Sequence, residues 1–211
     1  MKTKGKQYFS QSNLFLLTAV LSVFWFHTIS AAASTLDLIG VGWTKDVVTY
    51  LIKAGNAVSF QAIADVEDAI ADWNAVLGGT GAPLLVASGD KTADVVIQMK
   101  LGGGPTLGQT SFKTVSVFSC ELKSVRILLS GKSFGESFSS TGILNVAKHE
   151  LGHVFGLGHS DDPDDLMYFA AESGDIFGNE ELLISDCDIA AVQAIDSAIS
   201  TCSVPDSIEC D

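Results

Sequence analysis

The sequence predicts a single α/β or α+β domain over residues 34–211, preceded by an export signal. Strand-like and helix-like segments alternate in the order strand, helix, strands, helix, loop, helix. No segment repeats another and no linker-like stretch interrupts the order, so one domain accounts for it. The chain has 211 residues, of which 47% are hydrophobic and 18% charged, a composition that excludes a disordered protein.

In the first half of the domain the sequence predicts a strand, a helix and two further strands. Residues 47–52 are rich in β-branched and aromatic side chains, as is typical of a strand. A helix follows, because apolar side chains recur at three- and four-residue steps: Ile63, Val66, Ile70, Trp73 and Leu77. Two glycines, Gly78 and Gly79, end that helix. Residues 84–87 and 95–99 predict the next two strands, and the glycine-rich stretch 102–105 predicts a loop.

The second half contains two more strands and two more helices. The pattern from residue 108 to about residue 129 predicts two strands, the second over 125–129. Ser139, Ser140 or Thr141 can cap a helix that runs to about residue 155. Residues 156–184 are predicted to be irregular. Ser185, with Asp188 three residues later, resembles a capping box for a last helix over 186–198.

The N-terminal segment 1–33 has the three parts of a secretory signal peptide. Lys2, Lys4 and Lys6 precede an apolar run over 14–26, and three alanines follow at 31–33. We therefore expect a secreted, extracellular protein whose mature chain has no membrane contact. The alternative is membrane tethering by an uncleaved segment, because residues 14–33 hold few polar groups over a length that can span a bilayer.

Charge and cysteine content limit the partners and the compartment. The chain carries 12 basic and 25 acidic residues, a net charge of −13, which argues against a nucleic-acid partner. All four cysteines follow the signal segment: Cys120, Cys187, Cys202 and Cys210. An even number in an oxidising compartment predicts two disulfides, with three connectivities open. The absence of a C-x-x-C pair argues against a cysteine metal site or redox motif.

Every histidine outside the signal segment lies in one cluster, residues 149–159, with the sequence HELGHVFGLGH. His149 and His153 are four residues apart on the predicted helix, so both imidazoles project from one face. That spacing suits two bonds to one zinc ion. A continuing helix would carry His159 away from the ion, but Gly156 can adopt a positive φ, end the helix and turn the chain back.

Three histidine ligands leave a fourth position for water, as in a catalytic rather than a structural zinc site. Glu150 is rotated roughly 100° around the helix from His149, so it can face that water instead of the metal. Zinc lowers the pKa of the water towards about 7, and a neighbouring carboxylate can take its proton. The alternatives are three histidines without a metal and a non-catalytic zinc site. The extended spacing argues against the first and Glu150 against the second.

With these residues the sequence resembles the metzincin zinc endopeptidases, whose signature is H-E-x-x-H-x-x-G-x-x-H followed by a Met-turn. Ser160, directly after the third histidine, is the residue found in matrixins. Residues 159–168, HSDDPDDLMY, look like the matrixin pattern H-S-x-x-P-x-x-L-M-Y, and Met167 is then the Met-turn residue beneath the zinc. The resemblance covers residues 40–198, and a short cysteine-containing tail follows. It implies a five-stranded mixed sheet with one antiparallel edge strand, three helices, and a cleft between an upper and a lower subdomain.

The resemblance also implies a zinc-dependent endopeptidase with protein or peptide substrates. Zinc would polarise the scissile carbonyl, and Glu150 would activate the water and return its proton to the leaving amine. The substrate would lie extended along an edge strand near residues 108–115. Asn145, one helical turn before His149, and Tyr168 are the expected pocket residues. Two alternatives remain open: an inactive metzincin-like binding module, and a zinc amidase acting on a non-protein substrate.

The sequence departs from the animal matrixins in several places. Few residues separate the signal segment from the first strand, so no propeptide is expected, and Cys120 is not in a cysteine-switch context. Further histidines for a second zinc are lacking, so we expect one zinc ion. Calcium ligands or a solvated acidic loop are the two interpretations of four aspartates: Asp161, Asp162, Asp164 and Asp165. Phe169 replaces the usual proline after Met-Tyr and alters that wall of the pocket. We expect a monomer.

Overall fold

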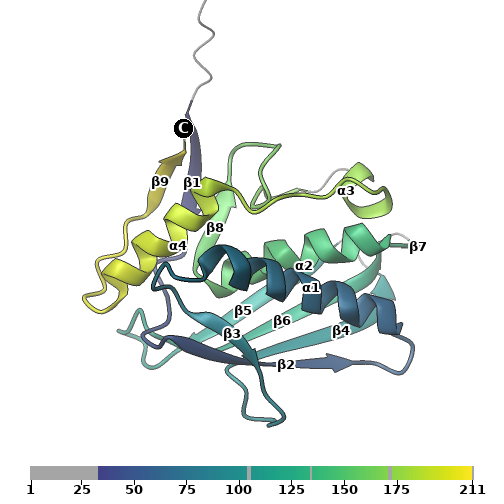
Figure 1. Ribbon diagram of the computed structural model, residues 1–211, viewed down its shortest axis with the longest axis horizontal. Coiled ribbons are helices and arrows are strands. Elements are labelled where there is room, and N and C mark those ends of the chain that lie inside the picture. Colours follow the sequence, from purple (N-terminus) through teal and green to yellow (C-terminus); the bar gives the residue numbers. More distant parts are fainter. Residues whose placement is uncertain (1–32, 104–105, 134, 171–172, 211) are drawn as a thin grey trace, which may run out of the picture. The chain divides into compact units, whose positions relative to one another are not determined.

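A mixed β-sheet forms the centre of the fold, and two long helices, α1 and α2, lie over one of its faces (Figure 1). The computed structural model describes residues 33–210, apart from 104–105, 134 and 171–172. The strands of the sheet are β2 (Val47–Ala54), β3 (Leu84–Ala87), β4 (Val95–Gly103), β5 (Gly108–Thr114), β6 (Leu122–Ser133) and β7 (Glu136–Ser137). The main strand order is β3-β2-β4-β6-β5, and β7 pairs with β6.

The pairing directions confirm the expected mixed sheet. β2 pairs in parallel with both β3 and β4, and β4 pairs in parallel with β6. β5, the last strand in the order, runs antiparallel to β6. The fold class and the antiparallel edge strand are therefore confirmed. β6 is longer than the predicted 125–129, because its ends contain polar residues and a glycine that carry no strand signal but continue the ladder with β4, β5 and β7.

The three long helices begin where side chains can cap them. They are α1 (Phe60–Leu77), α2 (Ser140–Val154) and α4 (Asp186–Ile199). Ser59 caps α1 and Ser139 caps α2, each accepting a hydrogen bond from a backbone N–H of the first turn. Ser185 and Asp188 form the predicted capping box of α4, with both reciprocal hydrogen bonds present.

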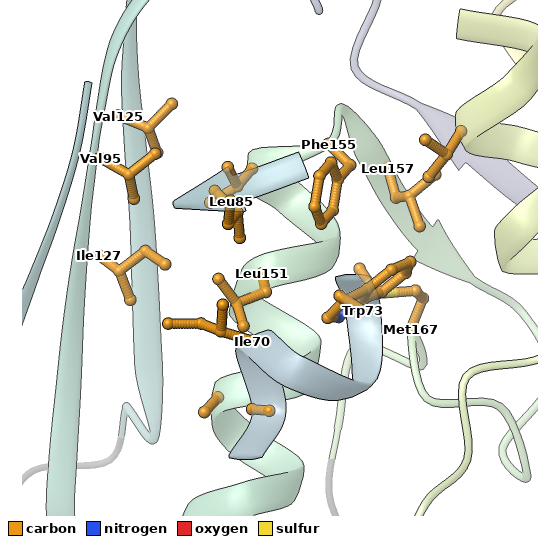
Figure 2. Packing of buried hydrophobic residues seen from close by; sticks show 14 of the residues in the cluster. Ile70, Trp73, Leu85, Val95, Val125, Ile127, Leu151, Phe155, Leu157 and Met167 are labelled. Atoms are coloured by element: carbon orange, nitrogen blue, oxygen red, sulfur yellow. The ribbon is translucent and has the colours of Figure 1, made fainter. Parts of the chain in front are cut away.

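Trp73 is the largest side chain in the core between α1 and α2 (Figure 2). It is fully buried, and its ring centroid lies 5.1 Å from that of Phe155. Its Nε1 donates a 2.9 Å hydrogen bond to the carbonyl of Lys148, so the polar end of the indole is satisfied as well. Truncating such a side chain typically costs about 3–5 kcal/mol, and here it would loosen the packing of α2.

A second, three-stranded sheet lies next to α4 in the order β8-β1-β9 (Figure 1). Its strands are β8 (Leu157–Ser160), β1 (Ser34–Leu38) and β9 (Ser207–Cys210). The prediction that 156–184 is irregular was therefore wrong, because this segment contains β8 and the short helix α3 (Ser173–Phe177). β8 is a strand because it pairs with β1, far away in sequence, whereas its own residues include a glycine and no β-branched side chain.

Two disulfides fix the C-terminal part of the chain, as predicted. Cys120 pairs with Cys202 and Cys187 with Cys210, which selects one of the three open connectivities. The first joins the β5–β6 hairpin to the end of α4, and the second joins the start of α4 to β9. The predicted signal segment, except for Ala33, lies outside the described residues. Within the part of the chain that the structure describes, no helix has the length and apolar character needed to cross a membrane.

Candidate metal centre

The three histidines of the sequence cluster converge at one point. His149 and His153 lie on consecutive turns of α2, and His159 lies on β8. One potential ligand atom from each ring lies within 4.8 Å of the other two. Among the described residues, this is the only group of three or more His, Cys, Asp or Glu side chains close enough to share a metal ion.

Gly156 produces the turn between the second and third histidines. Its φ is +94°, a conformation that side chains other than glycine rarely adopt. The helix ends at Val154, with Phe155 as its C-cap, and the chain reverses into β8. A Cβ on Gly156 would also overlap the carbonyl oxygen of Val41. Both the turn and the tight packing therefore need glycine here.

Backbone carbonyls orient two of the histidine rings. Nδ1 of His149 lies 2.8 Å from the carbonyl oxygen of Leu166, and Nδ1 of His153 lies 2.8 Å from that of Leu157. Because a carbonyl only accepts hydrogen bonds, each Nδ1 carries the proton and each Nε2 keeps a free lone pair. These rings therefore fit a metal ion that prefers neutral imidazole, such as zinc.

Burial keeps both of these histidines neutral. Desolvation, with a further contribution from the neighbouring His153 and His159, lowers the pKa of His149 to about 4. Desolvation also lowers the pKa of His153 below its usual value. At pH 7 both rings are therefore in the form that binds a metal, with no proton to displace from Nε2.

Glu150 is buried beside the histidines and bonded to the edge strand. Thr110 of β5 donates from Oγ1 to Oε2 of Glu150 at 2.5 Å. Burial raises the pKa of the Glu150 carboxyl to about 7, even though the Thr110 hydrogen bond lowers it. Gly108 of the same strand lies so close that a Cβ there would overlap the carboxylate. A buried carboxyl group with a pKa near neutrality can both accept and donate a proton.

Met167 is fully buried, with its sulfur against Gly152 of α2, the residue directly before His153. Its carbonyl accepts a 2.9 Å hydrogen bond from the N–H of Ser160, the residue after the third histidine. The chain thus returns at Met167 to the strand that carries His159. The rings of Tyr168 and Phe169 follow, 4.6 Å apart by their centroids, and Phe169 is exposed.

A cleft of about 740 Å³ contains this site. The three histidines, Glu150, Asn145 and Tyr168 all line it, so the structure brings together the predicted ligands, base and pocket residues. Its other walls come from β5 and from segments 163–170 and 175–182, including Gly108, Thr110, Phe169, Ile176, Phe177 and Leu182. Gly156 and Met167 support the site from outside the cleft lining.

Asn145 is buried and its amide is fully engaged by the backbone of segment 175–182. Nδ2 donates to the carbonyls of Asp175 at 2.9 Å and Glu180 at 2.7 Å. Oδ1 accepts from the N–H of Leu182 at 3.0 Å. The side chain thus lies at the edge of the cleft and fastens part of its wall to α2.

The acidic loop after His159 bonds to nearby backbone groups. Oδ1 of Asp161 accepts from the N–H of Thr35 at 2.6 Å, and Oδ1 of Asp162 accepts from that of Asp164 at 3.0 Å. Oδ1 of Asp165 accepts from the N–H of Met167 at 3.2 Å. Among the described residues, these four carboxylates do not form a group of three or more side chains close enough to share a metal ion.

The sequence did not identify Thr110, which bonds to Glu150, or Lys148, whose ammonium group donates to the carbonyl of Leu182 in the cleft wall. Thr110 is opposite the buried Ile127 in the β5–β6 ladder, so it is a polar residue on the inner face of the sheet. Lys148 is a lysine within a buried stretch of α2. In both cases the only signal in the sequence is a polar residue among positions that become buried. Neither polar partner could be predicted, because Glu150 is 40 residues from Thr110, and Asp72 and Glu181 are far from Lys148 in the sequence.

Comparisons with known proteins assign the chain to a family. A family model described as Matrixin matches residues 42–196, a range that includes the histidine cluster and Met167. Matrilysin from Homo sapiens is 38% identical over 65 residues, which are 31% of this chain and 21% of matrilysin. The chain thus spans about a fifth of that relative's length. Because the family model covers most of the sequence, the chain belongs to the matrixin family of zinc-dependent endopeptidases.

Proposed function

We propose that this chain is an exported endopeptidase that binds one zinc ion through His149, His153 and His159 and uses Glu150 as its general base. The observation that carries the proposal is the position of Glu150. Its carboxyl is buried in the cleft beside the three imidazoles, and its pKa is near 7. Bound to the histidines, zinc would supply Lewis acidity, polarising a carbonyl and lowering the pKa of a water molecule.

The side chains of the cleft have separate roles in peptide hydrolysis. Glu150 takes a proton from the attacking water and delivers it to the nitrogen of the leaving amine, so the same carboxyl acts first as base and then as acid. Thr110 fixes the carboxylate through its hydroxyl. The carbonyls of Leu166 and Leu157 hold the rings of His149 and His153 with Nε2 available to the ion.

A peptide substrate would bind as an extended strand beside β5. This strand is last in the order of the sheet, and Gly108, Gln109 and Thr110 line the cleft. In the described residues its outer edge has no strand partner, so its backbone groups can pair with a substrate. Asn145 and Tyr168 then border the pocket that takes the side chain next to the scissile bond.

We also propose that the chain is exported and that its N-terminal segment is cleaved off after residue 33. The composition of segment 1–33 supports it, as do the two disulfides, which suit an oxidising compartment. β1 begins at Ser34 and pairs with both β8 and β9, so the first residues of the proposed mature chain belong to the domain. Mass spectrometry of the secreted protein tests the cleavage position, and a retained segment would support membrane tethering instead. We propose that the mature protein is a monomer.

The activity is tested by incubating the purified secreted protein with a library of fluorogenic peptides. We expect cleavage that a zinc chelator abolishes and added zinc restores. A zinc-loaded protein that cleaves no peptide but binds some of them would be the inactive binding module. Hydrolysis confined to small amides, with every peptide left intact, would favour the amidase.

A further inference from the structure

Lys148, directly before His149, is a buried lysine that connects three parts of the domain. Its side chain is only 2% exposed. Nζ lies 2.8 Å from Oδ2 of Asp72 on α1 and 2.7 Å from Oε1 of Glu181. It also donates to the carbonyl of Leu182 at 3.4 Å. The three hydrogens of the ammonium group thus have three acceptors, from α1 and from the segment that precedes α4.

The ammonium group stays charged in this environment. Burial by itself lowers the pKa of Lys148, but the hydrogen bonds and charges of Asp72 and Glu181 outweigh burial and raise the pKa above its usual value. A buried charge that loses its partners is costly, so the lysine needs at least one carboxylate close by. The two carboxylates are about equally exposed, 45% for Asp72 and 47% for Glu181, and they differ in what they attach to the lysine.

Glu181 attaches the lysine to the wall of the cleft. Leu182, the next residue, lines the cleft and is held on both of its backbone groups. Its N–H donates to Oδ1 of Asn145, and its carbonyl accepts from Lys148. Asn145 and Lys148 are three residues apart and so lie on the same side of α2. The helical turn that leads into the first histidine therefore also fixes this wall.

We propose that Lys148 is a positioning residue for substrate selection, because its ion pair with Glu181 holds Leu182 in place and thereby limits the size of the side chain that the cleft accepts. This rests on the proposed peptidase function. The pair with Asp72 joins α2 to α1, and Asp72 is not among the residues that line the cleft. Asp72 thus provides a matched control, with the same charge, similar exposure and the same partner.

The test compares the variants Glu181→Ala and Asp72→Ala with the wild-type secreted protein. In each variant Lys148 keeps one carboxylate, so the folded state retains a partner for the buried charge. Each protein is given fluorogenic peptides that differ only in the residue after the scissile bond, leucine or tryptophan. Hydrogen exchange of the Leu182 amide is measured as well, since it needs no turnover.

For Glu181→Ala we expect the ratio of kcat/KM for tryptophan over leucine to rise about tenfold, mainly through KM, a change of the size that pocket fit usually produces. Exchange of the Leu182 amide should become faster. Asp72→Ala should leave both quantities at the wild-type value. Equal effects of the two variants, or no effect of Glu181→Ala on either quantity, would overturn the proposal.

The two proposals can fail separately. A wild-type protein that cleaves no peptide would contradict the peptidase function, and with it the proposed role of Lys148 in substrate selection. A protein that cleaves peptides while Glu181→Ala changes neither the ratio nor the exchange rate leaves the peptidase intact and removes the role of Lys148.

Discussion

Thr110 Oγ1 and Glu150 Oε2 lie 2.5 Å apart, and this hydrogen bond joins the edge strand β5 to the helix α2. The two residues are 40 positions apart in the sequence. The bond stabilises the ionised carboxylate, whereas burial stabilises the neutral acid, and the resulting pKa of Glu150 is about 7. The strand that would bind the substrate thus also adjusts the proton affinity of the proposed base.

Replacing Thr110 by valine removes this bond and keeps the side-chain shape. The pKa of Glu150 should rise further, because the hydroxyl lowers it. If the ionised carboxylate is the base, the acidic limb of the pH profile of kcat/KM moves to higher pH, by on the order of one unit for a charge-assisted bond. Thr110→Ser keeps the hydroxyl and should retain the wild-type profile. An acidic limb that stays in place in the valine variant would show that Thr110 does not act on the base.

His159→Ala should weaken zinc binding, as the same change at His149 or His153 should. The substitution removes one of three imidazoles that lie within reach of one ion. Metal content is measured after dialysis against zinc-free buffer, with the wild-type protein in parallel. One zinc retained per chain in the His159 variant would mean that the third ligand lies elsewhere.

Asp188 should make stability depend on pH. It is fully buried, Oδ2 accepts a 2.9 Å hydrogen bond from the N–H of Ser185, and Oδ1 has no partner in the described part of the chain. Burial and the nearby charge of Asp165 raise the pKa of Asp188 to about 6. The folded state thus holds this proton more tightly than the unfolded state does. The contribution of Asp188 to the free energy of unfolding therefore falls as pH rises from about 4 to about 6.

Asp188→Asn cannot ionise and keeps an acceptor for the N–H of Ser185. Its free energy of unfolding relative to the wild type should increase by up to about 3 kcal/mol between pH 4 and pH 7, since one pKa unit corresponds to about 1.4 kcal/mol. Unfolding both proteins with denaturant at several pH values measures this difference. The ionisation of other groups affects both proteins equally and therefore cancels in the difference. A difference that is the same at every pH would show that folding does not raise the pKa of Asp188.

Local signals in the sequence predicted much of the fold and of the histidine cluster. The helix of His149 and His153 has its cap, its apolar positions and its terminating glycine within one stretch of the chain. The spacing of these residues was therefore enough to predict the helix. The same holds for the capping box of Ser185 and Asp188. In each case the interacting groups are only a few residues apart.

The missed features depend on contacts between distant residues. β1, β8 and β9 are short strands that form by pairing with one another, and none of them has a strong strand pattern. Thr110 reaches Glu150, and Lys148 reaches Asp72 and Glu181, only after the chain has folded. Such pairs cannot be predicted from the spacing of residue types along the sequence.

The most direct test of the account is the variant Glu150→Gln, measured for both peptide cleavage and zinc content. Glutamine keeps the size of the side chain but cannot take up a proton, and Glu150 is proposed as base rather than ligand. We expect about one zinc per chain, as in the wild type, with turnover reduced by about 10²–10⁴-fold, as when a general acid–base group is removed. Loss of zinc from the variant would make Glu150 a ligand, and cleavage at the wild-type rate would mean that another group is the base.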